Sequence, residues 1–149
     1  MVWYKRYIDG LWVQAEGAIY DFFDRNIHVV DRPPSAAEYW IAGIDYGTVN
    51  PFCCLLIGVS SGKYTQTGKR LWVEKEYYWD VSVTHRQKTN TEFLRDMQTF
   101  LGDYPLKGIY IDPNAASMKL EMRRAGMSVI DADNEVLEGI RTTAALMCD

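Results

Sequence analysis

The stretch Tyr39-Trp-Ile-Ala-Gly-Ile-Asp-Tyr-Gly-Thr-Val-Asn-Pro51 decides how this chain folds. It begins with a short apolar run that is typical of a strand covered on both faces of a sheet. A carboxylate, Asp45, follows where that strand should still be packing, and a lone buried carboxylate is costly unless it is paired or bound to a cation. Gly47 lets the backbone turn closely around it, and the apolar run 52–59 predicts the return strand. Asp45 is therefore either a turn residue that bonds its own backbone or part of a functional site.

A second stretch, 107–114, favours the functional site. It reads Lys-Gly-Ile-Tyr-Ile-Asp-Pro-Asn, so a short strand ends at Asp112 and Pro113 forces the chain out of the sheet. Sites in open α/β sheets lie beyond the carboxyl ends of parallel strands. If the two strands are neighbours, Asp45 and Asp112 meet at one edge and repel each other unless a hard cation such as Mg²⁺ or Mn²⁺ lies between them. Without metal, this repulsion should raise the proton affinity of both acids.

The rest of the chain predicts alternating elements. A third strand is expected over 70–78, near a sheet edge, with Trp72, Glu74 and Glu76 on one face. A helix is expected over 84–101, with its regular part starting at Thr89 or Asn90. The elements expected after it are a helix over 115–125, a short strand over 127–130 and a closing helix over 135–147. A short helix is also expected within 2–13. Antiparallel strands thus come first, and strands alternating with helices follow.

Three segments in this order resemble the nuclease domain of the tailed-phage terminase large subunit: 41–51, 109–113 and 134–142. The resemblance covers most of the chain from about Trp40 onward. It implies an α/β fold of the ribonuclease-H-like type, a mixed sheet of antiparallel hairpin strands followed by parallel strands, flanked by helices and incomplete at the C-terminus. Residues 1–37 would then be an N-terminal arm that follows an ATPase domain, and 38–149 the truncated nuclease domain, with a stiff connector at 31–37 between them.

The activity that the resemblance implies is cleavage of concatemeric viral DNA by two-metal hydrolysis with Mg²⁺ or Mn²⁺. Asp45 would be the catalytic residue that bridges the two ions, and Asp112 would hold one of them. The family also places a third acid on a later helix, in an Asp-His-x-x-Asp setting that this chain lacks. We therefore expect the chain to fold but to cut DNA poorly. Full activity would instead point to Asp131, Asp133 or Glu74 as the third ligand.

Further expectations concern partners. The resemblance implies double-stranded DNA, a portal protein and a small terminase subunit as partners, in the host cytoplasm. Lys63, Lys119, Arg123 and Arg124 are candidate phosphate contacts, although the last three also suit a solvated helix face. The hairpin at 60–68 would line the DNA groove.

Composition bounds these interpretations. The 149 residues suffice for one domain with a core, and the net charge of −4 argues mildly against a dedicated DNA-binding module. No apolar run approaches the roughly 20 residues of a membrane span, and the N-terminus lacks the apolar core of a signal peptide, so we expect neither a membrane protein nor a secreted one. Two alternatives stay open. One is an ATP-binding fragment of the actin and sugar-kinase type, because 45–48 reads Asp-x-Gly-Thr. The other is a docking fragment of the packaging motor that cuts nothing.

Overall fold

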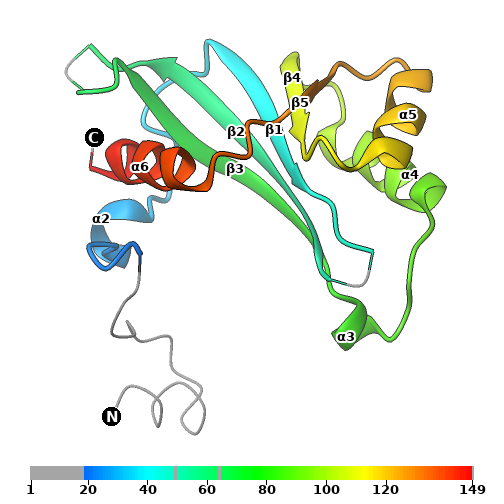
Figure 1. Cartoon of the computed structure of the whole chain (residues 1–149). Coiled ribbons are helices and arrows are strands. Elements are labelled where there is room, and N and C mark those ends of the chain that lie inside the picture. Colours follow the sequence, from blue (N-terminus) through cyan, green and yellow to red (C-terminus); the bar gives the residue numbers. More distant parts are fainter. Residues whose placement is uncertain (1–18, 49, 64, 149) are drawn as a thin grey trace, which may run out of the picture.

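A computed structural model of the chain describes residues 19–48, 50–63 and 65–148. Its centre is a five-stranded mixed sheet in the order β3-β2-β1-β4-β5 (Figure 1). The strands are β1 (Tyr39–Asp45), β2 (Phe52–Ser61), β3 (Lys69–Trp79), β4 (Leu106–Ile111) and β5 (Val129–Asp131). The helices are α2 (Arg25–His28), α3 (Val81–Thr84), α4 (Asn90–Leu101), α5 (Ala116–Arg124) and α6 (Val136–Met147). The helix expected within 2–13 lies outside the described residues.

The strand directions follow from the connections between the strands. β1, β2 and β3 pair antiparallel because short turns join them, whereas β4 pairs parallel to β1 and β5 parallel to β4. Each parallel strand is reached through a helical crossover, α4 before β4 and α5 before β5, as parallel pairing requires. The predicted fold class, a mixed sheet with antiparallel strands first and parallel strands after them, is confirmed.

The hydrophobic core lies between one face of the sheet and the helices α4 and α5. The Phe52 ring of β2 stacks on the Phe93 ring of α4 with centroids 4.3 Å apart. Met97 of α4 and Met118 of α5 are fully buried in the same cluster. Apolar side chains at helical spacing thus meet the alternate residues of the strands. On the other side of the sheet, α6 contacts β3 (Figure 1).

The helix expected over 84–101 is shorter than predicted. Residues 85–89 are not helical, and His85 has a left-handed backbone with φ 51°. The helix α4 begins after Thr89, whose side chain accepts from the Glu92 N–H while the Glu92 side chain accepts from the Thr89 N–H. This reciprocal capping box fixes the start of a helix. The predicted start of the regular helix at Thr89 or Asn90 is therefore confirmed, whereas the helical turn expected before it is wrong.

The expected face pattern of β3 is also wrong in part. The register between β2 and β3 shifts between Leu56 and Ile57, which are paired with Lys75 and Val73. Glu74 is therefore an extra residue on β3, and a bulge of this kind reverses the alternation of faces. The Trp72 ring lies 5.9 Å from the Trp40 ring, on the side of the sheet that carries the core. Sequence alternation alone does not show such an insertion.

Among the described residues, no helix combines the length and apolar character that crossing a membrane requires.

Candidate active site

The two acids singled out from the sequence lie at the same end of neighbouring strands. β1 and β4 are parallel, and Ile44 is paired with Ile111 in their register. Asp45 and Asp112 each follow the paired isoleucine by one position. Because both isoleucines are buried in the core and side chains alternate along a strand, the two carboxylates leave on the opposite face. Neighbouring strands lie about 4.8 Å apart, so the backbones bring these acids together.

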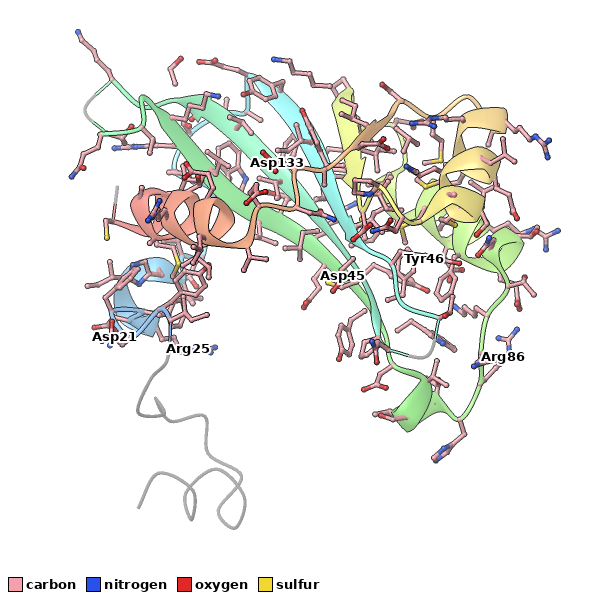
Figure 2. All side chains as sticks on the ribbon, viewed as in Figure 1. Asp21, Arg25, Asp45, Tyr46, Arg86 and Asp133 are labelled. Atoms are coloured by element: carbon pink, nitrogen blue, oxygen red, sulfur yellow. The ribbon has the colours of Figure 1, made fainter. Side chains whose placement is uncertain are left out.

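The turn after Asp45 is tight because Gly47 has no side chain. A Cβ atom at this position would lie 2.3 Å from the backbone oxygen of Asn50 and 2.4 Å from that of Pro51. The Tyr46 hydroxyl donates to Asn90 Oδ1 over 2.6 Å, which ties the turn to the start of α4. Asp45 itself is exposed at the end of β1 (Figure 2). The turn thus holds Asp45 at the protein surface, at the carboxyl end of the central strand β1.

Cys53 shows that a second carboxylate lies near Asp45. It is the antiparallel partner of Asp45, and its sulfur lies 4.0 Å from Glu76 Oε1 of β3. Burial raises the pKa of the Cys53 thiol, and the negative charges of Glu76 and Asp45 raise it further. Negative potential therefore extends over three strands at this end of the sheet, which favours a cation.

The Asp112 carboxylate is held by two nitrogen donors. The Asn114 N–H donates to Oδ1 over 2.6 Å, and Asn134 Nδ2 donates to Oδ2 over 3.0 Å. The pKa of Asp112 lies below its usual value, chiefly because of the Asn114 N–H and then because of the Asn134 amide and the Lys119 charge. The expected rise in the proton affinity of Asp112 is therefore wrong, since the hydrogen bonds donated to the ionised carboxylate lower its pKa.

The donor set suits a hard divalent cation. A carboxylate oxygen has two lone pairs, so each oxygen of Asp112 keeps one after accepting its hydrogen bond. Together with the exposed Asp45, it offers the oxygen ligands that Mg²⁺ and Mn²⁺ prefer. Across residues 19–48, 50–63 and 65–148, however, no group of three or more His, Cys, Asp or Glu side chains is placed to hold a metal ion. The two carboxylates alone would hold an ion weakly.

The three acids considered as a third ligand have other partners. Asp131 accepts from Lys119 Nζ over 2.7 Å. Asp133 Oδ1 accepts from the Glu135 N–H over 3.0 Å, and Glu74 Oε2 accepts from Trp72 Nε1 over 3.1 Å. Asp131 thus bonds a buried lysine, Asp133 bonds the backbone two residues along the chain, and Glu74 bonds a tryptophan two residues before it on β3.

Lys119 is buried, with 7% of its surface exposed. Its ammonium donates to Pro113 O over 2.6 Å and to Asp131 Oδ1 over 2.7 Å. Pro113 follows Asp112 directly, so Lys119 holds the residue next to the acid and joins the ends of β4 and β5. It lies close to the site, but on the core side of the sheet.

The other three basic candidates do not gather around the acids. Arg123 donates to Val129 O over 3.3 Å, and it lies with Arg124 at the C-terminal end of α5, where both are exposed. Lys63 is in the turn between β2 and β3. Cys53, next to Asp45, and Ser61, next to that turn, are eight positions apart on β2, or about 27 Å at about 3.4 Å per residue. The hairpin therefore lies at the far end of the sheet from Asp45 (Figure 1).

Sequence reasoning missed Asn134 and Cys53 as neighbours of the acids. Asn134 opens a segment that had been singled out only as a family motif, without a role. Its contact with Asp112 joins residues 22 positions apart, so no local pattern indicates it. Cys53 is the antiparallel partner of Asp45 across the hairpin, a register that the apolar runs of the sequence do not fix.

The fold and this pair of acids define a ribonuclease-H-like α/β domain. Structures of the large terminase from a thermophilic bacteriophage are 41% identical to this chain with a TM-score of 0.78, one in complex with ADP and one in another crystal form. They cover 99% of this chain, which spans 36% and 35% of theirs. The large terminase of bacteriophage HK97 shares the fold, with 12% identity, a TM-score of 0.58, and coverage of 85% of this chain and 32% of that one. No family model and no curated protein matches the chain.

The chain therefore matches a fragment of the phage terminase large subunit, as its sequence motifs indicated. It corresponds to about a third of the length of the large terminase from the thermophilic phage.

Proposed function

We propose that this chain is the metal-dependent DNA endonuclease part of a phage DNA-packaging terminase. The observation that supports the proposal most strongly is the position of Asp45 and Asp112, each one residue beyond the paired Ile44 and Ile111 at the carboxyl ends of two parallel neighbouring strands. The similarity to phage large terminases supports it further. The similar structures are large terminases, which favours this proposal over an ATP-binding fragment of the actin type.

Asp45 and Asp112 would hold divalent metal ions, Mg²⁺ or Mn²⁺, through their carboxylate oxygens. Such ions, when bound, activate water and stabilise the leaving oxygen in phosphodiester hydrolysis. Asp45 would be the ligand shared between the ions, because it is exposed and projects from a central strand. Asp112 would hold one ion, and two donors fix the orientation of its carboxylate. The hydrogen bonds that lower the pKa of Asp112 stabilise its ionised form, and that is the form that binds metal.

Double-stranded DNA is the proposed substrate, and a portal protein and a small terminase subunit are the proposed partners in the host cytoplasm. Arg123 and Arg124 remain proposed phosphate contacts on an exposed helix end, and Lys63 a proposed contact at the far hairpin. We assign Lys119 instead to holding the Asp112 turn, because its ammonium already has two partners.

The test is a nuclease assay on supercoiled plasmid in Mn²⁺. We expect slow nicking by the 149-residue chain, because the described residues place no group of three acidic or other ligand side chains for a metal ion, and no nicking by Asp45→Asn or Asp112→Asn. The matched control is Asp103→Asn, since Asp103 lies between α4 and β4 at the opposite end of β4. Equal nicking by all variants would reveal a contaminant and refute the assignment of the two acids. No nicking by the wild-type chain would favour the docking fragment.

A further inference from the structure

Asn134 is the described residue whose side chain bonds the Asp112 carboxylate from outside its own turn. Its Nδ2 lies 3.0 Å from Asp112 Oδ2. An ionised carboxylate only accepts hydrogen bonds, so the amide nitrogen of Asn134 must face it and the amide oxygen must point away. This contact therefore has a defined direction.

The link that carries Asn134 is anchored on both sides of it. Residues 132–135 lead from β5 to α6 and pass across the face of the sheet (Figure 1). The Ala132 N–H donates to Ile111 O over 2.9 Å, at the position directly before Asp112. On the other side, the Asp133 carboxylate accepts from the Glu135 N–H over 3.0 Å. These two bonds hold the backbone around Asn134 in place.

A third contact ties the start of this link to the turn after Asp112. Lys119 bonds both Asp131, the last residue of β5, and the backbone oxygen of Pro113. The segments that carry Asn134 and Asp112 are thus joined through a lysine that is 7% exposed. A donor that rigid elements hold in this way keeps its partner in one orientation at little entropic cost.

We infer that Asn134 is a positioning residue that holds the Asp112 carboxylate in the orientation in which it binds a divalent cation. The metal in this inference rests on the proposed function, whereas the hydrogen bond between Asn134 and Asp112 does not depend on it. Asn134 fixes one oxygen and the Asn114 N–H the other, so the carboxylate cannot rotate about its χ2 bond without losing both bonds. One lone pair on each oxygen stays open toward the ion. Partners that orient a ligand in this way commonly contribute about 10- to 100-fold to metal affinity.

The test compares wild-type chain, Asn134→Ala, Asp112→Asn and the double variant. Mn²⁺ affinity is measured by titration calorimetry, and the ¹³C signal of the Asp112 carboxyl carbon is recorded in the metal-free chain. We expect Asn134→Ala to shift the Asp112 signal and to weaken Mn²⁺ binding about tenfold, with little change in Tm. In the Asp112→Asn background, Asn134→Ala should have no further effect, because the two residues act as a unit. Asn26→Ala, in the distant helix α2, is the matched control.

An unchanged Asp112 signal in Asn134→Ala would overturn the inference, as would equal losses of Mn²⁺ affinity with and without the Asp112 carboxylate. A large fall in Tm together with an unshifted signal would show a structural role only. If the wild-type chain binds no Mn²⁺, the proposed function fails, and the carboxyl signal alone then decides whether Asn134 positions Asp112.

Discussion

Lys88 should contribute measurably to stability, because its ammonium lies in an aromatic pocket of the domain. Nζ lies 2.5 Å from Asp96 Oδ2, 3.1 Å from the Tyr77 hydroxyl oxygen and 3.6 Å from the centroid of the Trp79 ring. The lysine side chain is 11% exposed and that of Asp96 30%. The ammonium thus joins the segment before α4 to the edge strand β3. The perturbation is Lys88→Met, which keeps the aliphatic chain and removes the charge.

The magnitude follows from the two interactions that are lost. A hydrogen bond to a charged group contributes about 1.5–3 kcal/mol, and a largely desolvated cation–π contact about 0.5–2 kcal/mol. Water can reach the Asp96 carboxylate after the change, so its hydration recovers part of the lost free energy. We expect the free energy of unfolding to fall by about 2–3 kcal/mol. At about 3 °C per kcal/mol for a chain of this size, Tm should fall by about 6–9 °C.

The assay is urea unfolding followed by circular dichroism, on Lys88→Met, Asp96→Asn and the double variant. The two changes should couple by about 1–2 kcal/mol, since the residues are in direct contact. Lys107→Met is the control, because Lys107 lies over the Tyr39 ring at 4.5 Å on an exposed site, and should change stability by less than about 0.5 kcal/mol. A loss below about 0.5 kcal/mol in Lys88→Met, or zero coupling, would refute the reasoning.

The pH dependence has a defined sign. Burial opposes the charge of both partners, but for Asp96 the bonds from Lys88 and Tyr77 outweigh it and the pKa is lowered. The bonds of Lys88 to Asp96 and Tyr77 likewise raise the lysine pKa despite burial. The contribution of Asp96 is therefore present above its unfolded pKa of about 3.9 and is lost as pH falls through the folded value. That of Lys88 is present below about 10.4 and is lost at higher pH. Between these limits, the difference between wild type and Lys88→Met should be constant.

Three further changes test the core, the turn and the buried lysine. Phe93→Ala removes the ring stacked on Phe52 and should cost about 3–5 kcal/mol in urea unfolding; a loss below about 1 kcal/mol would show that the site collapses around the gap. Gly47→Ala places a methyl group against backbone oxygens and should lower the free energy of unfolding by about 1–3 kcal/mol. Gly43→Ala, with nothing within 4 Å of its Cβ, should lower it less, and equal losses would contradict the tight turn at Gly47. Lys119→Met should cost about 1–3 kcal/mol in urea unfolding without changing the salt dependence of DNA binding; unchanged stability with weaker DNA binding would return Lys119 to the role of a phosphate contact.

The sequence by itself determined the strands and the two acids. Apolar runs that end in Asp45-x-Gly47 and in Asp112-Pro113 have a local cause, because burial, turn formation and strand termination depend on a few neighbouring residues. The start of α4 was predictable for the same reason, since the capping box at Thr89 and Glu92 spans one turn. The order of these elements then placed both acids at the carboxyl edge of one sheet.

Only the tertiary structure decided what surrounds those acids. Asn134 reaches Asp112 because the link between β5 and α6 passes over the sheet, and Lys119 turns inward because Asp131 and Pro113 meet its ammonium there. The bulge at Glu74 reverses the faces of β3 through its pairing with β2, which sequence alternation does not record. Such contacts join residues far apart in the chain, and their geometry depends on how whole elements pack. Local sequence patterns therefore identify candidate site residues, whereas packing decides how their side chains are oriented.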